Sequence, residues 1–92
     1  MEILQKDDGK KGIFFIEQDG NILAEMTYVW AGEKIIIDHT EVSEVLGGKG
    51  IGKQLVHRAV EFAREKHIKI LPLCPFAKAV LNKVSEYHDV VL

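Results

Sequence analysis

The sequence predicts a mixed α+β fold: an antiparallel meander of three strands, a central helix, a fourth strand parallel to the third, and a second helix. Three observations support this fold class. Residues 12–42 alternate apolar and polar side chains in runs separated by turn signals. Residues 50–66 change to helical periodicity. A short apolar run and a proline then follow, which is typical of a strand leading into another helix.

The three strands of the meander are defined by their turns. Residues 12–19 form the first strand, and Asp19-Gly20 is a strong hairpin signal. Residues 22–30 form the second, with alternate residues such as Met26 and Tyr28 on one face. Residues 34–42 form the third. The polar residues 1–12 are interpreted as a lead-in with a brief strand at residues 2–4.

The elements after the meander follow from spacing and from proline. Apolar residues at helical spacing predict a helix over residues 50–66 that crosses the meander. Residues 68–73 form the fourth strand, which we expect to be parallel to the third because a crossover helix precedes it. Pro75 suits the first turn of the second helix, with Cys74 near its N-cap. The tail, residues 87–92, ends in a short strand.

Composition narrows the class of protein. The chain has 92 residues, of which 47% are hydrophobic, enough for a single domain covering residues 1–92. No apolar run is long enough to span a bilayer, and no signal-peptide core follows Met1, so we expect a soluble, cytoplasmic protein without membrane partners. One cysteine, Cys74, allows no internal disulfide and no cysteine-rich metal site. We therefore expect no metal.

Charge is distributed unevenly along the chain. Residues 1–48 carry ten acidic residues and four lysines, whereas residues 49–69 carry six basic residues and two acidic ones. The overall charge of −2 argues against general nucleic-acid binding. The basic block begins at a cluster of glycines, which favours an anionic ligand there, and the acidic front half suits a cationic partner.

Four glycines in six positions stand at the predicted start of the central helix. They are Gly47, Gly48, Gly50 and Gly52. A strand, a glycine-rich turn and a helix N-terminus leave backbone N–H groups unpaired and pointing in one direction, which is an anion site that Lys49 and Lys53 can assist. Side chains at these positions would hold a phosphate away from the backbone. A flexible turn alone would explain one or two of these glycines, but not four.

Three phosphate-binding patterns compete for this loop. The spacing from Gly47 to Lys53 satisfies G-x-x-x-x-G-K, but Gln54 stands where a P-loop has Ser or Thr. The dinucleotide pattern G-x-G-x-x-G fails because the third glycine is missing. The third pattern resembles the coenzyme A signature of the GNAT acetyltransferase superfamily, R/Q-x-x-G-x-G/A, in which Gly50 and Gly52 take the two small positions and Gly47 replaces Arg or Gln. The segment Pro72-Leu73-Cys74-Pro75-Phe76 also resembles a subgroup of very small proteins of this superfamily.

The resemblance implies a minimal GNAT-like fold and acetyl-CoA, or coenzyme A, as the cofactor. It implies that the third and fourth strands splay apart and that the pantetheine arm meets the strand edge at Thr40 and Val42. The pyrophosphate is expected to meet the loop. The implied cofactor-binding residues are Thr40, Val42, Gly47, Gly48, Lys49, Gly50, Ile51, Gly52 and Lys53.

Four residues are candidates for the chemistry. Histidine is the side chain whose ordinary pKa is nearest to neutrality, and His39 precedes the predicted cofactor edge, so it can act as a base. A hydrogen-bonding structural role is the alternative. Glu41 can act through water or hold a cationic acceptor, with a solvated strand face as the alternative. Cys74 can carry an acetyl group or protonate the coenzyme A thiolate, or simply fill space at a strand end. Tyr87 is the candidate for the tyrosine acid that the resemblance implies.

The alternation of the third strand predicts that Ile35, Ile37, His39 and Glu41 share one side of it.

These observations predict an acetyl-CoA-dependent N-acetyltransferase that acts on an amine of a protein or a small molecule. The alternative from another class is a non-catalytic acyl-CoA binding or sensing module, and a third is nucleotide binding through the near-P-loop. The chain lacks the two helices that the superfamily usually inserts between its first strands and the C-terminal strands that it usually adds, so we expect the acceptor site to be open unless a partner subunit closes it. A homodimer formed through Tyr28, Trp30 or the tail would do so, and the alternative is that these aromatic residues lie in the core.

Overall fold

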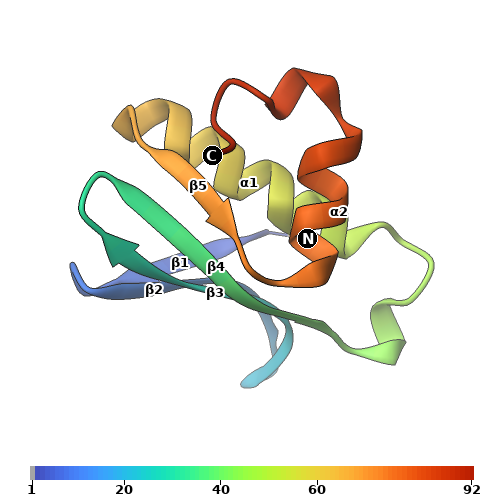
Figure 1. Ribbon diagram of the computed structural model, residues 1–92. Coiled ribbons are helices and arrows are strands. Elements are labelled where there is room, and N and C mark those ends of the chain that lie inside the picture. Colours follow the sequence, from blue (N-terminus) through green and yellow to red (C-terminus); the bar gives the residue numbers. More distant parts are fainter. Residues whose placement is uncertain (1) are drawn as a thin grey trace.

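The structure is a computed structural model that describes residues 2–92. Its five strands form one sheet in the order β1-β2-β3-β4-β5, and both helices cover the same face of that sheet (Figure 1). The elements are β1 (Leu4–Asp7), β2 (Lys11–Gln18), β3 (Asn21–Ala31), β4 (Lys34–Val42), the 3-10 turn η1 (Glu44–Leu46), α1 (Ile51–Lys66), β5 (Lys69–Pro72), α2 (Pro75–Lys83) and the 3-10 turn η2 (Ser85–Tyr87). The other face carries no helix among the described residues.

The antiparallel part of the sheet has four strands. The three predicted strands are present as β2, β3 and β4, and the hairpin at Asp19-Gly20 is confirmed, with φ angles of 53° and 80° at the two residues. The brief strand expected at residues 2–4 lies instead at Leu4–Asp7, where it pairs with β2. The lead-in therefore adds a fourth antiparallel strand to the predicted meander.

A β-bulge interrupts the pairing of β3 with β4. Thr27 lies opposite His39, but the next residue, Tyr28, lies opposite Ile37, so Asp38 is the extra residue. Because an extra residue breaks the period of two, side chains beyond the bulge change faces relative to those before it.

The bulge corrects one expectation from the sequence. Ile35 and Ile37 are buried under the helices, whereas His39 and Glu41 pair with β3 residues of the opposite face and are exposed. The prediction that these four side chains share one side of β4 is wrong. The face that His39 and Glu41 occupy is called here the open face of the sheet.

Strands β4 and β5 are parallel, and β5 is the shorter of the two. Their pairing ends at Ile37 opposite Pro72, while β4 continues to Val42. The N–H of Ser43 donates to the carbonyl of Leu23 on β3 at 2.7 Å. Since successive N–H groups of a strand point to opposite sides, the N–H of Val42 points away from β3, into the gap that β5 leaves. All four residues of β5 pair with β4, so the β4 edge at Thr40 and Val42 is free because β5 ends at Pro72, and the splaying of the two strands stays a prediction.

The core lies between the sheet and the helices. The inward face of α1 is fully buried, with its residues Leu55, Val56, Ala59, Val60 and Ala63 at 0% exposure. Tyr28 is buried among Phe14, Phe62 and Trp30, at ring-centroid distances of 5.2 to 6.4 Å. The core interpretation of Tyr28 is therefore the right one. No helix in residues 2–92 is long and apolar enough to cross a membrane.

Candidate functional site

A cavity of about 380 Å³ opens where β5 ends beside β4. It is bounded by the β4 edge, the loop after β4, the first turn of α1 and the start of α2, and its lining residues are Thr40, Val42, Leu46, Gly47, Gly48, Gly50, Ile51, Gly52, Lys53 and Phe76. Eight of the nine predicted cofactor-binding residues line this one cavity. The ninth, Lys49, lies on the other side of the loop and lines a neighbouring cavity with Glu17 and Val45.

The start of α1 supplies unpaired donors to this cavity. The first backbone bond of the helix runs from the N–H of Gln54 to the carbonyl of Gly50 at 3.1 Å. Among the described residues, the N–H groups of Ile51, Gly52 and Lys53 meet no backbone acceptor, and no side chain caps the helix. The first turn has no acidic residue and includes Lys53, so no carboxylate of this turn offsets the positive end of the helix dipole. An anion fits this position.

Two of the four glycines are required by the backbone conformation. Gly48 and Gly50 have φ angles of 78° and 68°, in the left-handed region that other residues rarely adopt. No atom lies within 4 Å of a Cβ built at either position. Both glycines line the candidate cofactor cavity, so a methyl group at either position would extend into open space where a phosphate is expected to approach the backbone.

Gly52 lines the cavity as predicted, and the structure adds a second reason for a glycine at this position. A Cβ at Gly52 would lie 2.6 Å from Cζ of Phe76, so this glycine lets the Phe76 ring pack against the first turn of α1. Gly47 has an ordinary φ of −59° and ends η1, where its N–H donates to the carbonyl of Glu44 at 2.9 Å. The buried side chain of Leu46 fixes this end of the loop to the core.

Cys74 closes the inner end of the gap between β4 and β5. It is the N-cap residue of α2 and is 6% exposed. Its N–H and that of Leu73 both donate to the carbonyl of Ile37, at 3.0 and 2.9 Å, which holds the end of β5 against β4. Its Sγ lies 3.3 Å from Oγ1 of Thr40. A thiol and a hydroxyl therefore meet at the edge of the candidate cofactor cavity.

The surroundings of Cys74 favour its thiolate. Burial by itself raises the pKa of the Cys74 thiol. Hydrogen bonds from the Thr40 hydroxyl and from the backbone N–H groups of Ala77, Phe76 and Thr40 outweigh this effect, so that the pKa lies below its ordinary value. The N-terminal turn of α2 thus stabilises a negative charge on sulfur.

The other predicted catalytic residues lie apart from Cys74. His39 and Glu41 are on the open face, with 4.0 Å between Nε2 and Oε2 and more than half of each side chain exposed. Thr40, between them in sequence, faces the helices. The β4 strand therefore separates the thiol from the histidine and the glutamate.

Tyr87 lies at the end of α2, in η2. Its hydroxyl is 2.9 Å from Nδ1 of His57 on α1, and it is absent from the lining of the cofactor cavity. The structure does not bring Tyr87 together with Cys74 or Thr40.

Two features of the site were not predicted. Phe76 lines the cavity, and the Thr40 hydroxyl meets the Cys74 sulfur. The sequence holds a signal for the position of Phe76. Pro75 marks the first turn of a helix, and an aromatic residue in that turn can pack on a glycine-rich loop that lies beside it. The contact between Thr40 and Cys74 joins residues 34 positions apart and left no signal in the sequence.

The fold and the cavity define a class: a small α+β domain in which the free edge of a parallel strand and a glycine-rich helix start form the candidate cofactor cavity. The model of the GCN5-related N-acetyltransferase family matches residues 13–90. The chain therefore belongs to the GCN5-related N-acetyltransferase (GNAT) family.

Individual proteins agree with this assignment. A GCN5-like protein from Staphylococcus aureus, solved by NMR in solution, is 44% identical, with a TM-score of 0.74 over 99% of this chain and 87% of that one. Protein NATD1 of Gallus gallus is 28% identical over 86 residues, which cover 89% of this chain and 78% of NATD1. The ribosomal-protein-alanine N-acetyltransferase of Brucella melitensis shares the fold, with a TM-score of 0.67 at 21% identity over 83% of this chain and 63% of that one.

Proposed function

We propose that this protein is an N-acetyltransferase that uses acetyl-CoA and transfers the acetyl group to an amine. The observation that carries the proposal is that the uncapped N-terminus of α1 and the free edge of β4 line one cavity. The thiol of Cys74 lies next to this cavity, in contact with the hydroxyl of Thr40, which lines it. A nucleotide P-loop has less support, because an antiparallel sheet precedes the loop and Gln54 replaces the metal-binding hydroxyl.

The residues of the cavity fit the parts of coenzyme A. The unpaired N–H groups of Ile51, Gly52 and Lys53, with the Lys53 ammonium, suit the pyrophosphate. The Val42 N–H on the free β4 edge suits an amide carbonyl of the pantetheine arm or the thioester carbonyl. When bound, acetyl-CoA supplies an activated acyl thioester.

Cys74 is the reactive group best placed for acyl chemistry. As a thiol it can give its proton to a sulfur leaving group, and as a thiolate it can act as a nucleophile that carries an acyl group. Both roles use the same hydrogen bonds from Thr40 and from the start of α2, which stabilise the thiolate form. In either role, His39 on the open face is the base that receives the one proton lost by the incoming amine, and Glu41, 4.0 Å from it, holds the cationic acceptor before transfer.

A second candidate function is that of a non-catalytic acyl-CoA binding or sensing module. It is favoured by the exposure of His39 and Glu41 and by their position across β4 from the thiol. This candidate needs the glycine loop and the β4 edge, but not His39 or Cys74.

Calorimetric titration with acetyl-CoA, coenzyme A and ATP tests the cofactor assignment. The informative variant is Gly48→Ala, and its matched control is Gly20→Ala. Both positions have similar positive φ angles, 78° and 80°, and no atom within 4 Å of a built Cβ, so the two changes strain the backbone alike. We expect Gly48→Ala to weaken acetyl-CoA binding at least tenfold, and Gly20→Ala to leave it unchanged. Equal effects of the two variants, or binding of ATP alone, would contradict the assignment.

Turnover separates the two candidate functions. Release of free coenzyme A in the presence of an amine panel, followed by mass spectrometry of the amines, detects transfer. Intact mass of the wild-type protein and of Cys74→Ser after exposure to acetyl-CoA detects an acyl adduct on the thiol. Acetylated amine supports the enzyme. Tight binding of acetyl-CoA without acetylated amine or adduct identifies the binding module.

A further inference from the structure

Phe76 is a phenylalanine that lies at the surface of the candidate cofactor cavity and not in the core. Its side chain is 41% exposed. The core beneath α2 is filled by Ala77 and Leu81, both at 0% exposure. Among the residues that the structure describes, Phe76 is the one residue of α2 that lines the cavity. Its ring therefore has a role at the cavity.

The ring of Phe76 rests on the backbone of the first turn of α1. The three atoms nearest to a Cβ built at Gly52 all belong to this ring, at 2.6, 2.8 and 3.5 Å. Alanine is the better helix former, so helix propensity does not explain a glycine inside α1. The close approach of the ring does explain it. The ring thus joins the start of α2 to the end of the cavity that an anion fits.

The backbone of Phe76 serves the thiol of Cys74. Cys74 is the N-cap residue of α2, and the N–H groups of Phe76 and Ala77 favour its thiolate. The sulfur lies 3.3 Å from Oγ1 of Thr40, which lines the same cavity as the ring. One residue therefore meets Gly52 with its side chain and supports Cys74 with its N–H.

We propose that Phe76 is a positioning residue for Cys74. Its ring, packed on Gly52, holds the first turn of α2 against the start of α1 and so keeps the thiol beside Thr40. A ligand that fills the cavity lies against this ring, so binding at the start of α1 and the geometry at the thiol are linked through one side chain. The use of this link in acyl transfer rests on the proposed function. The positioning itself rests only on contacts within the chain.

The pH titration of thiolate ultraviolet absorbance, measured on the full chain without any coenzyme A, tests this proposal. Cys74 is the one cysteine of the chain, so the signal reports a single thiol. We expect Gly52→Ala to raise the pKa of Cys74 and to leave about threefold less thiolate at neutral pH, because the methyl group displaces the ring. Phe76→Leu is expected to raise this pKa as well, because leucine lacks the ring atoms that meet Gly52.

The double variant separates the ring contact from other effects of an alanine at position 52. In a Phe76→Leu background the methyl group of Gly52→Ala has room, so it should not raise the pKa of Cys74 any further. Additive rises would overturn the proposal, because the alanine would then act on the thiol without the ring. Phe76→Leu removes atoms only at the cavity surface, so it carries the test if Gly52→Ala does not fold.

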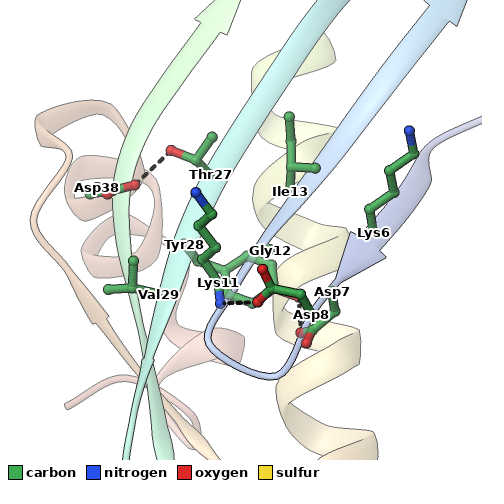
Figure 2. A pocket seen from close by; sticks show the side chains of 10 residues that line it. All are labelled: Lys6, Asp7, Asp8, Lys11, Gly12, Ile13, Thr27, Tyr28, Val29 and Asp38. Atoms are coloured by element: carbon green, nitrogen blue, oxygen red, sulfur yellow. Dashed lines mark hydrogen bonds between the residues drawn. The ribbon is translucent and has the colours of Figure 1, made fainter.

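The matched control for Phe76→Leu is Phe15→Leu, on the open face of the sheet. Phe15 is buried there, and the Lys6 ammonium lies 5.5 Å from the centre of its ring. Lys6 belongs to a cavity of this face that β1 to β4 form, and none of its lining residues comes from α1 or α2 (Figure 2). Phe15→Leu should therefore destabilise the fold without changing the pKa of Cys74. An equal change of this pKa in both leucine variants would overturn the positioning role.

The outcomes distinguish this proposal from the proposed function. An unchanged pKa of Cys74 in folded Gly52→Ala and Phe76→Leu would overturn the positioning role and leave acetyl-CoA binding untouched. If the pKa rises in both variants but acetyl-CoA does not bind to the wild-type protein, the positioning role stands and its use in acyl transfer fails.

Discussion

At the scale of single residues, the thiol of Cys74 is the group whose chemistry depends most on its surroundings. Its pKa is lowered although burial by itself would raise it, because the Thr40 hydroxyl lies 3.3 Å from the sulfur and the backbone N–H groups of Thr40 and of the first turn of α2 favour the thiolate. The sequence could place Cys74 at a helix N-cap, since proline follows it. It could not predict the Thr40 partner, because that contact exists only once β4 and β5 lie side by side.

Replacing Thr40 by valine removes the hydroxyl bonded to Cys74 and should raise the pKa of the thiol. The pH titration of thiolate ultraviolet absorbance measures this pKa. Thr27→Val is the control, because the Thr27 hydroxyl binds Asp38 on the opposite face. An unchanged pKa of Cys74 in Thr40→Val would show that the Thr40 hydroxyl is not needed to lower the pKa of the thiol.

The same lowered pKa links stability to pH. The folded pKa of Cys74 lies below the unfolded one, so the stabilisation is fully present above the unfolded pKa, about 8.5, and is lost as pH falls through the folded pKa. The stability difference between wild type and Cys74→Ser should therefore increase with pH over this window. Chemical denaturation at several pH values measures it, and a constant difference would contradict the prediction.

Tyr28 and Asp7 form a second coupled pair of residues. Burial alone would raise the pKa of Asp7. Hydrogen bonds from Tyr28, Gly9 and Trp30 outweigh it and lower the pKa overall, while burial and the Asp7 contact raise the pKa of Tyr28. Gln5 also donates to the Tyr28 hydroxyl, at 2.8 Å. These bonds attach β1, the edge strand, to the core.

Tyr28→Phe removes both bonds of this hydroxyl and should cost about 1–2 kcal/mol in urea denaturation. Because the folded pKa of Asp7 is lowered, its contribution is present above the ordinary aspartate pKa, about 3.9, and is lost as pH falls through the folded value. The difference between wild type and Tyr28→Phe should therefore shrink in acid. Tyr87→Phe, whose hydroxyl binds His57 on the surface, is the control that should leave the acid limb unchanged.

At the scale of elements, the alternation of apolar and polar residues and the turn residues predict most of the fold. They do not predict the bulge at Asp38, which decides the face that each later side chain of β4 occupies. The boundaries of β4, α1 and the start of α2 follow from the sequence within one residue. An inserted residue in a strand leaves no mark on a short polar run such as Asp38-His39-Thr40, since all three residues are compatible with either face. The bulge consequently places Thr40 with the cofactor cavity and His39 with the open face.

Gly12 on β2 has no side chain, and the ring of Tyr28 on β3 packs directly against its backbone. A Cβ at this position would lie 2.2 Å from Cζ of Tyr28, its partner across the strands. Gly12→Ala should therefore destabilise the protein by about 1–3 kcal/mol in chemical denaturation. In a Tyr28→Leu background the methyl group has room, so the cost should largely disappear. The same cost in both backgrounds would show that the ring is not the cause.

At the scale of the whole molecule, the chain has two layers, a sheet and the two helices that cover one of its faces (Figure 1). The helix side holds the candidate cofactor cavity, and the open face carries the exposed side chains of His39 and Glu41. The sequence predicts the helix side through its glycines and its helical periodicity. Which side chains of β4 reach the open face becomes visible only when the sheet is assembled, because the bulge at Asp38 decides it.

This division predicts how cofactor binding acts on a chain of 92 residues with one modest core. Acetyl-CoA at a hundred times its Kd should stabilise the fold by about 2.7 kcal/mol, which corresponds to a rise in Tm on the order of 10 °C for a domain of this size. Amide hydrogen exchange should slow locally at Val42 and at residues 51–53, whose N–H groups gain acceptors. The exposed turn at Gly9, beyond the sheet, is the internal control and should exchange at the same rate. A rise in Tm without slower exchange at Val42 would show that acetyl-CoA stabilises the protein by binding somewhere other than the cavity between β4 and β5.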